Sequence, residues 1–144
     1  MDMAFNAALK AYDCDEIPVG AVIVKDSIVL AVAYNQKETK KSVIYHAEIL
    51  AINEASSKVD NWRLDGCDMY VTLEPCPMCA GAIKQARIKN VYSALSNSDK
   101  KNSLIIKQIF DDVSINPKVE IFNDLAVERS TKILTDFFKQ RRKK

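Results

Sequence analysis

Four residues of the chain could perform hydrolytic chemistry together, and they stand in two short motifs. His46 and Glu48 form a His-x-Glu pair, and Cys76 and Cys79 form a Cys-x-x-Cys pair further along the chain. Zinc favours imidazole nitrogen and thiolate sulfur as ligands. A structural zinc site is normally closed by four protein ligands, whereas a catalytic site keeps one position for water. Because His46, Cys76 and Cys79 supply three ligands, they predict one catalytic Zn²⁺ per chain.

Glu48 is predicted to move protons and not to bind the metal. Water on zinc has a pKa near 7, so a base beside it can take its proton at neutral pH. A carboxylate two residues from a ligand can lie next to that water without ligating the metal. We therefore predict that Glu48 is the general acid and base of a hydrolytic reaction.

Each motif alone has an ordinary explanation. A Cys-x-x-Cys pair can be a redox pair, and a single histidine is more often a core or surface residue than a ligand. The two motifs together are more specific, since each is expected to open a helix with a strand between them. A zinc-stabilised binding module without catalysis is a further alternative, but it has no use for Glu48. For Cys14 and Cys67 the sequence suggests no partner.

The hydrophobic pattern predicts the elements that must position these residues. Two β-branched runs flank the short polar turn Lys25-Asp26-Ser27 and predict a hairpin. Both runs are apolar throughout, which indicates helices on both faces of the sheet. Pro77 suits the first turn of a helix, where a missing N–H costs nothing. We expect helices over residues 3–14, 46–55, 79–87, 103–110 and 125–139, strands over 20–24, 28–34, 67–73, 90–94 and 118–122, and loops over 35–45 and 95–102.

This order of elements predicts an α/β fold, a three-layer α/β/α sandwich around a mixed five-stranded sheet. Both ligand motifs then lie at helix N-termini, whose partial positive charge favours thiolates. The small residues Ala80-Gly81-Ala82 in the second of these helices allow a close approach, either of the sheet or of a second subunit. The adjacent Phe137 and Phe138 cannot share one helix face, so we expect one in the core and one free.

Length and composition set the broad class of protein. The 144 residues suit one domain, residues 1–144, and 48% apolar with 28% charged residues is ordinary for a globular protein. No apolar run approaches the roughly 20 residues that span a bilayer. The first residues carry an acid and no basic, apolar export signal, so we expect a cytoplasmic protein with reduced cysteines.

Three segments resemble the cytidine/deoxycytidylate deaminase superfamily, and more narrowly the bacterial tRNA-specific adenosine deaminases. They are Pro18-Val19-Gly20-Ala21-Val22, His46-Ala47-Glu48-Ile49, and the run from Tyr70 to Ile83 that contains Pro75-Cys76-Pro77-Met78-Cys79. The His-x-Glu and Pro-Cys-x-x-Cys pair is the known signature of zinc-dependent base deaminases. The resemblance covers nearly the whole chain and implies a cytidine deaminase-like fold.

The resemblance also implies roles for single residues. It makes His46, Cys76 and Cys79 the zinc ligands and Glu48 the proton shuttle, and it makes Asn35 a contact to the target nucleoside. It implies hydrolytic deamination of adenosine to inosine at the wobble position of a tRNA anticodon, by a homodimer. A small-molecule deaminase of the same fold, acting on guanine or a cytosine nucleoside, is the alternative.

The chain departs from the family pattern after the fourth predicted strand. The family usually has an Arg-Asp pair there, and this chain has Ser96 in place of the aspartate within a run that lacks glycine. The basic residues of the 35–45 loop, Lys100-Lys101 and the tail Arg141 to Lys144 would suit an RNA backbone. For the tail, a solvated, frayed terminus is the alternative.

Overall fold

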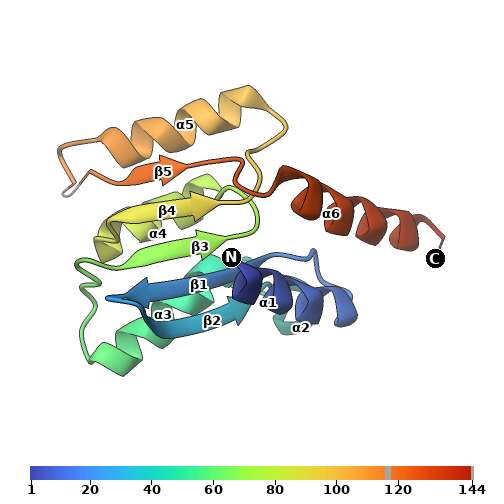
Figure 1. The fold of residues 1–144 in the computed structure, drawn as a ribbon, viewed down its shortest axis with the longest axis horizontal. Helices are drawn as coiled ribbons and strands as arrows, with labels where there is room; N and C mark the ends of the chain where they lie inside the picture. Colours follow the sequence, from blue (N-terminus) through green and yellow to red (C-terminus); the bar gives the residue numbers. More distant parts are fainter. Residues whose placement is uncertain (116–117, 144) are drawn as a thin grey trace.

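The computed structural model describes residues 1–115 and 118–143 and is built around one five-stranded sheet with strand order β2-β1-β3-β4-β5 (Figure 1). Strands β1 and β2 are antiparallel, β1 is antiparallel to β3, and β3, β4 and β5 are parallel, which confirms the mixed sheet. The elements in chain order are α1 Asp2–Asp13, β1 Gly20–Lys25, β2 Ile28–Tyr34, α2 Lys37–Lys40, α3 Ala47–Val59, β3 Asp68–Val71, α4 Pro77–Ala86, β4 Asn90–Ser93, α5 Lys100–Asp111, β5 Glu120–Phe122 and α6 Val127–Arg142.

The predicted hairpin forms with a two-residue turn. Asp26 and Ser27 both have positive φ, 49° and 66°. A turn with two such residues has the backbone twist that matches paired antiparallel strands. The turn brings β2 back along β1, so that the C-terminal ends of β2, β3 and β4 lie at the same edge of the sheet.

Helices cover both faces of the sheet, as the sequence predicts. Side chains alternate between the two faces of a strand. Ala21 and Ile23 of β1 join the main core with Ala47 and Ala51 of α3, whereas Gly20 faces α1 on the opposite side. A methyl group on Gly20 would lie 1.9 Å from the backbone oxygen of Ala4, so only glycine lets α1 approach this closely. Helices α4 and α5 pack on the α3 side of the sheet, through the buried residues Ile83, Ile106 and Phe110.

The second face is only partly covered, which corrects one expectation from the hydrophobic pattern. Strand β2 is an edge strand, and its residues Val29 and Val32, which pair with Val24 and Val22 of β1 on the α1 side, are exposed. Helix α1 therefore leaves these apolar side chains uncovered.

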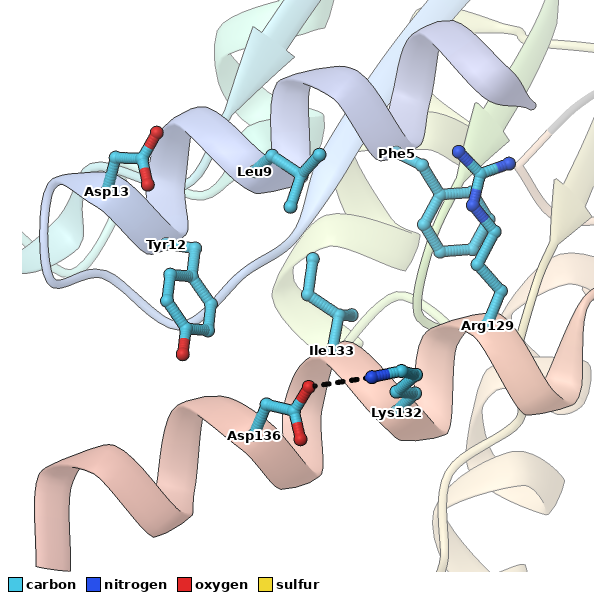
Figure 2. A pocket seen from close by; sticks show the side chains of 8 residues that line it. All are labelled: Phe5, Leu9, Tyr12, Asp13, Arg129, Lys132, Ile133 and Asp136. Carbon is cyan, nitrogen blue, oxygen red and sulfur yellow. Dashed lines mark hydrogen bonds and ion pairs between the residues drawn. The ribbon is translucent and has the colours of Figure 1, made fainter.

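Helix α6 extends past the edge of the sheet and packs along α1 (Figure 1). The ring of Phe137 meets Tyr12 edge-on at 5.7 Å, and Arg129 donates to Asp2 at 2.6 Å. Phe137 is 2% exposed and Phe138 is 42% exposed, which confirms that one faces the core and one is free. A cavity of about 360 Å³ lies between the two helices. Figure 2 shows the side chains that line it, which are Phe5, Leu9, Tyr12, Asp13, Arg129, Lys132, Ile133 and Asp136.

Two predicted loops contain helix. Residues 37–40 form α2 inside the expected 35–45 loop, and α5 begins at Lys100 and not at residue 103. The Asp99 side chain accepts from the Lys101 amide at 2.9 Å, which caps the earlier start. Helix α6 continues through Arg142, so Arg141 and Arg142 are helical, while Lys144 of the basic tail lies outside the described residues.

The chain's single tryptophan marks the far end of the helix pair α3 and α4. Trp62 follows the end of α3, and Arg87 is the C-cap residue of α4. The guanidinium carbons of Arg63 and Arg87 lie 5.3 and 5.5 Å from the centre of the indole ring. In the described part of the chain, no helix is both long and apolar enough to cross a bilayer.

Candidate active site

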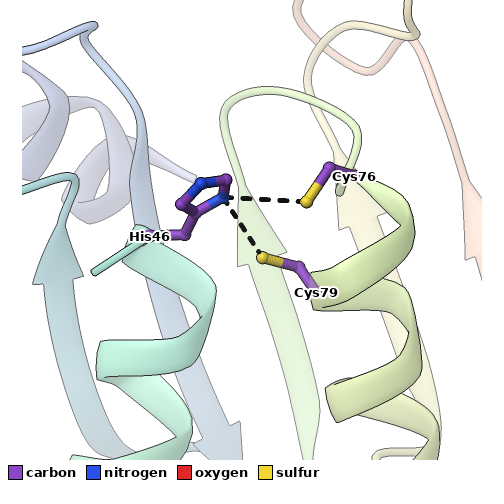
Figure 3. A group of neighbouring side chains, drawn as sticks. All are labelled: His46, Cys76 and Cys79. Carbon is purple, nitrogen blue, oxygen red and sulfur yellow. Dashed lines mark hydrogen bonds between the residues drawn. The ribbon is translucent and has the colours of Figure 1, made fainter. Parts of the chain in front are cut away.

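The three predicted metal ligands come together at the N-termini of α3 and α4 (Figure 3). His46 is the N-cap residue of α3 and Cys76 is the N-cap residue of α4. Pro77 occupies the first turn of α4, as predicted, and Cys79 follows two residues later, so that its side chain returns toward Cys76. The two helix ends therefore present one nitrogen and two sulfurs to the same point.

The spacing of these donor atoms fits a tetrahedral zinc ion. The Nδ1 atom of His46 lies 3.7 Å from the sulfur of Cys76 and 3.5 Å from the sulfur of Cys79. All three donor atoms lie within 4.8 Å of one another. With Zn–S near 2.3 Å and Zn–N near 2.0–2.1 Å, the nitrogen–sulfur edge of a tetrahedron is about 3.6 Å. The residues present could thus hold a metal ion, and three donors leave one tetrahedral position open.

The two thiols are electrostatically unlike. A hydrogen bond from Cys79, the largest effect, and the neighbouring backbone N–H groups lower the pKa of Cys76 to about 5. The same hydrogen bond, together with burial and the nearby Glu48 carboxyl, raises the pKa of Cys79. The pair therefore readily holds one negative charge, which a cation at this point would favour.

Glu48 lies in the first turn of α3, and its side chain lines the same pocket as His46 and Cys76. Its relative exposure is only 4%. Burial disfavours the charged form and raises the pKa of Glu48 to about 7, and negative charge on Cys76 acts in the same direction. A carboxyl group with this pKa can both accept and release a proton near neutral pH.

The pocket beside these residues has a volume of about 210 Å³. Asn35, the predicted nucleoside contact, lines it. The Asn35 amide donates to the Ile17 carbonyl at 3.2 Å, and its oxygen accepts from the Lys37 amide at 3.3 Å. These two bonds fix the carboxamide while leaving it one further donor and one further acceptor position. The pocket is lined by Ile17, Val19, Asn35, Lys37, His46, Ala47, Glu48, Leu73, Glu74, Cys76 and Asn97.

Sequence reasoning gave no role to two polar residues of the pocket, Glu74 and Asn97. Glu74 could have been noticed as an acid between a predicted buried strand and the Pro-Cys motif. Asn97 lies in the loop that departs from the family pattern, and nothing in its spacing indicates a site. Among the other cysteines, Cys14 is exposed and Cys67 is buried, and both are free thiols.

Comparison with known proteins identifies the family. The family model of the MafB19-like deaminases matches residues 1–142. The tRNA-specific adenosine deaminase of Bacillus subtilis (strain 168) is 37% identical over 144 residues, covering 100% of this chain and 89% of that protein.

Two solved structures are also similar. One comes from a study of A-to-I editing by tRNA:A34 deaminases and superimposes with a TM-score of 0.84 at 35% identity, covering 93% of this chain and 97% of that one. A guanine deaminase from Bacillus subtilis superimposes with a TM-score of 0.65 at 32% identity, covering 98% and 90%. Together with the full-length relatives, these matches confirm the resemblance carried by the two motifs: the chain belongs to the MafB19-like deaminase family, alongside the tRNA-specific adenosine deaminases that it matches over its whole length.

Proposed function

We propose that residues 1–144 form one zinc-dependent deaminase domain that converts adenosine to inosine at the wobble position of a tRNA anticodon. The observation that carries this proposal is the convergence of His46, Cys76 and Cys79 beside the buried Glu48, in a chain 37% identical over its full length to a tRNA-specific adenosine deaminase. A non-catalytic zinc module would leave the buried carboxyl of Glu48 without a purpose.

His46, Cys76 and Cys79 would hold one zinc ion per chain, and that ion would supply Lewis-acid activation of water at neutral pH. The chain's own chemistry is proton transfer by Glu48. Its carboxylate takes a proton as the water oxygen bonds to C6 of the adenine ring and the C6=N1 double bond opens. The resulting carboxylic acid donates the proton to the amino nitrogen, so that the bond from C6 to this nitrogen breaks, the C6=N1 double bond re-forms and ammonia leaves. The proton that stays on the new hydroxyl group moves to N1, which gives the 6-oxo form of inosine. Burial raises the pKa of Glu48 and so favours the protonated form, which lets the carboxyl group hold the proton between the two halves of this transfer.

Asn35 orients the nucleoside. Its carboxamide is held by Ile17 and Lys37 and lines the pocket. A fixed amide with a spare donor and acceptor can bond a base or a sugar without paying the entropy of ordering its own side chain.

RNA is the partner that the charges favour. Lys37 lines the pocket and is exposed, and Arg141 and Arg142 end α6. A base inside a duplex hides its amino-bearing carbon, so a loop nucleotide turned into the pocket is the accessible substrate. We place the reaction in the cytoplasm, where reducing conditions keep all four cysteines free, as they are here.

We further propose that the active unit is a homodimer. In α4, Ala80 is buried against the sheet, but an added methyl group on Gly81 would meet nothing within 4 Å, and Met78 is 38% exposed. The packed-sheet explanation therefore suits Ala80 alone, and the outward side of the small-residue run remains open to a second subunit.

The test is a deamination assay on four substrates measured separately: an anticodon stem-loop with a wobble adenosine, free guanine, cytidine and adenosine. We expect the stem-loop to be deaminated and the three small molecules not to be. The Glu48→Gln variant should keep its zinc and lose at least about 100-fold in turnover, the lower range for acid–base catalysis. Guanine deamination is the second candidate, because a guanine deaminase matches 98% of the chain at 32% identity. Efficient guanine turnover without stem-loop turnover would replace the proposal with that candidate.

A further inference from the structure

Two buried carboxylates beside the pocket have no part in the proposed proton transfer. Glu16 is 0% exposed and accepts from the backbone amides of Glu38 and Thr39, at 2.9 and 2.6 Å, so it holds the N-terminus of α2. Glu74 is 4% exposed and lines the pocket itself. Burying a carboxylate costs free energy unless it is hydrogen-bonded. The hydrogen bonds of each carboxylate offset this cost, and they hold the bonded segment in place.

Glu74 is the centre of a network that joins three distant segments. Its Oε1 accepts from the Asn97 amide at 2.9 Å, from Asn97 Nδ2 at 3.1 Å and from the Ser103 hydroxyl at 2.6 Å, and its Oε2 accepts from Asn123 Nδ2 at 2.9 Å. An ionised carboxylate has about two acceptor positions on each oxygen, so three donors share Oε1 and one donor leaves a further position on Oε2. Most of the acceptor capacity of Glu74 is therefore spent on holding these three segments together.

Asn97 is the residue that this network presents to the pocket. Its backbone N–H and its side-chain nitrogen both donate to the same oxygen of Glu74, which fixes the plane of the carboxamide. Oδ1 is the free acceptor of the side chain, since no hydrogen bond reaches it from the described residues, and the second N–H of Nδ2 has no partner among them either. Asn97 lines the pocket and is half-buried, so its fixed carboxamide brings a free acceptor to the pocket wall.

The topology places this acceptor across the pocket from the predicted nucleoside contact. Asn35 follows β2, Glu74 follows β3 and Asn97 follows β4, and the C-terminal ends of these three strands share one edge of the sheet. Strands β1 and β3 lie between β2 and β4. A nucleoside at the metal donors would thus have one carboxamide on each side.

We propose that Asn97 is a specificity-determining residue, whose carboxamide oxygen accepts a hydrogen bond from an N–H or O–H group of the target nucleoside, and that Glu74 is a positioning residue that acts through Asn97. This inference rests on the proposed function, because it requires a nucleoside in the pocket. A site built to bond a donor discriminates strongly against ligands that lack it.

The test compares Asn97→Ala, Glu74→Gln and the double variant, with Ser98→Ala as the matched control on an exposed neighbour that does not line the pocket. Zinc content and thermal unfolding are measured first for each protein. We expect Asn97→Ala to raise KM for the stem-loop about tenfold, the effect of one lost hydrogen bond, with kcat changed less than about threefold. Ser98→Ala should match the parent protein.

The double variant separates positioning from a merely structural role. If Glu74 acts through Asn97, the double variant raises KM for the stem-loop no more than Asn97→Ala alone does. Binding of a labelled stem-loop in the Glu48→Gln background gives the same comparison without turnover. A stem-loop with 2′-deoxyadenosine assigns the donor: the effect of Asn97→Ala persists if the contact is to the base and disappears if it is to the 2′-hydroxyl.

Two results would overturn the inference. The first is a KM for Asn97→Ala within twofold of the parent protein. The second is a KM increase in the double variant equal to the two single effects combined, because Glu74 would then not act through Asn97. Failure of the proposed function is seen separately, since the parent protein would then turn over guanine or cytidine in place of the stem-loop. The same variants measured on that substrate would still decide the role of Asn97.

Discussion

His46 and Cys76 are N-cap residues, yet neither side chain caps its helix. Such positions usually carry Ser, Thr, Asp or Asn, whose oxygen accepts an orphan amide and stabilises the helix by about 1 kcal/mol. Here both side chains turn toward each other and the helix amides stay available to stabilise negative charge on the sulfurs. Each of these two helices therefore lacks the side-chain cap that would stabilise its first turn.

Metal binding is therefore expected to depend on every one of the three donors. Cys76→Ser removes the thiolate with the lowered pKa and keeps the size of the side chain. We expect the variant to lose zinc during dialysis and to melt at a lower temperature than the zinc-loaded parent, because metal binding is coupled to folding. The measurement is zinc content by metal analysis alongside a thermal melt. Cys14→Ser is the control, since Cys14 is exposed and outside the site, and full zinc occupancy in Cys76→Ser would disprove the assignment.

The raised pKa of Glu48 predicts a pH dependence of stability in the metal-free protein. The folded-state pKa of about 7 lies above the ordinary 4.5, so between these values the folded protein binds more protons than the unfolded chain. The contribution of Glu48 to stability is complete below about pH 4.5 and is lost as pH rises toward 7. Over the full window the loss is on the order of 3 kcal/mol, at about 1.4 kcal/mol per unit.

Comparison with Glu48→Gln isolates this effect. Cys76 has a lowered pKa and gives the opposite slope, since its thiolate stabilises the fold as pH rises above about 5, but both proteins contain it. The free energy of unfolding in urea, measured after chelation at several pH values, should therefore fall with pH in the parent relative to the variant. A constant difference between the two proteins from pH 4.5 to 7 would contradict the prediction.

At the scale of elements, the close contact between α1 and β1 depends on Gly20. An added methyl group would lie 1.9 Å from Ala4 O and 2.8 Å from Ala8 N, and both are backbone atoms that cannot rotate away. We expect Gly20→Ala to destabilise the fold by about 3 kcal/mol or more, at or above the upper range for overpacking. Chemical denaturation with far-UV circular dichroism measures this loss.

Gly81 supplies the matched control. The same methyl group there meets nothing within 4 Å of the chain, and alanine in a helix is favoured over glycine by about 1 kcal/mol. Gly81→Ala should leave the fold as stable or more stable. If a second subunit packs on this position, the variant should shift the population from dimer to monomer in sedimentation while the fold persists.

The elements that the sequence predicts correctly are those whose pattern is local. Periodic apolar residues define α1 and α3, and Pro77 marks the start of α4. Helix α2 has no buried residue and therefore no periodicity, and it forms because Glu16 accepts the amides of Glu38 and Thr39 from more than twenty residues away. Asn97 escaped prediction for the same reason, since only the distant Glu74 gives it a fixed position. The motif residues could be predicted because their chemistry is visible in their types.

At the scale of the molecule, α6 carries basic residues away from the sheet (Figure 1). The guanidinium carbon of Arg141 lies 5.4 Å from the centre of the Phe137 ring, so this side chain also contributes to packing. The effect of charge on RNA binding is therefore better tested by changing Arg142 and Lys143. We expect Arg142→Gln with Lys143→Gln to weaken stem-loop binding by a similar factor for all sequences. Each lost phosphate contact should reduce the salt slope by roughly 0.7 for a single strand.

Zinc content and turnover of bound RNA should stay unchanged in this variant. Lys58→Gln is the control, because Lys58 is exposed near the C-terminal end of α3 and pairs only with Glu54 among the described residues. Salt titrations of a fluorescent stem-loop measure both slopes. An unchanged slope would return the tail to the alternative of a merely solvated terminus.

The position of Trp62 gives the protein an internal optical reporter. The helices α3 and α4 have the predicted metal donors at one end and the indole near two guanidinium groups at the other, about 20 Å apart by the length of α3. Because the chain has no other tryptophan, its emission reports on that far end alone. Zinc release reports on one end of the helix pair, and the tryptophan emission reports on the other end. If both change at the same temperature on heating, the pair melts as a single cooperative unit.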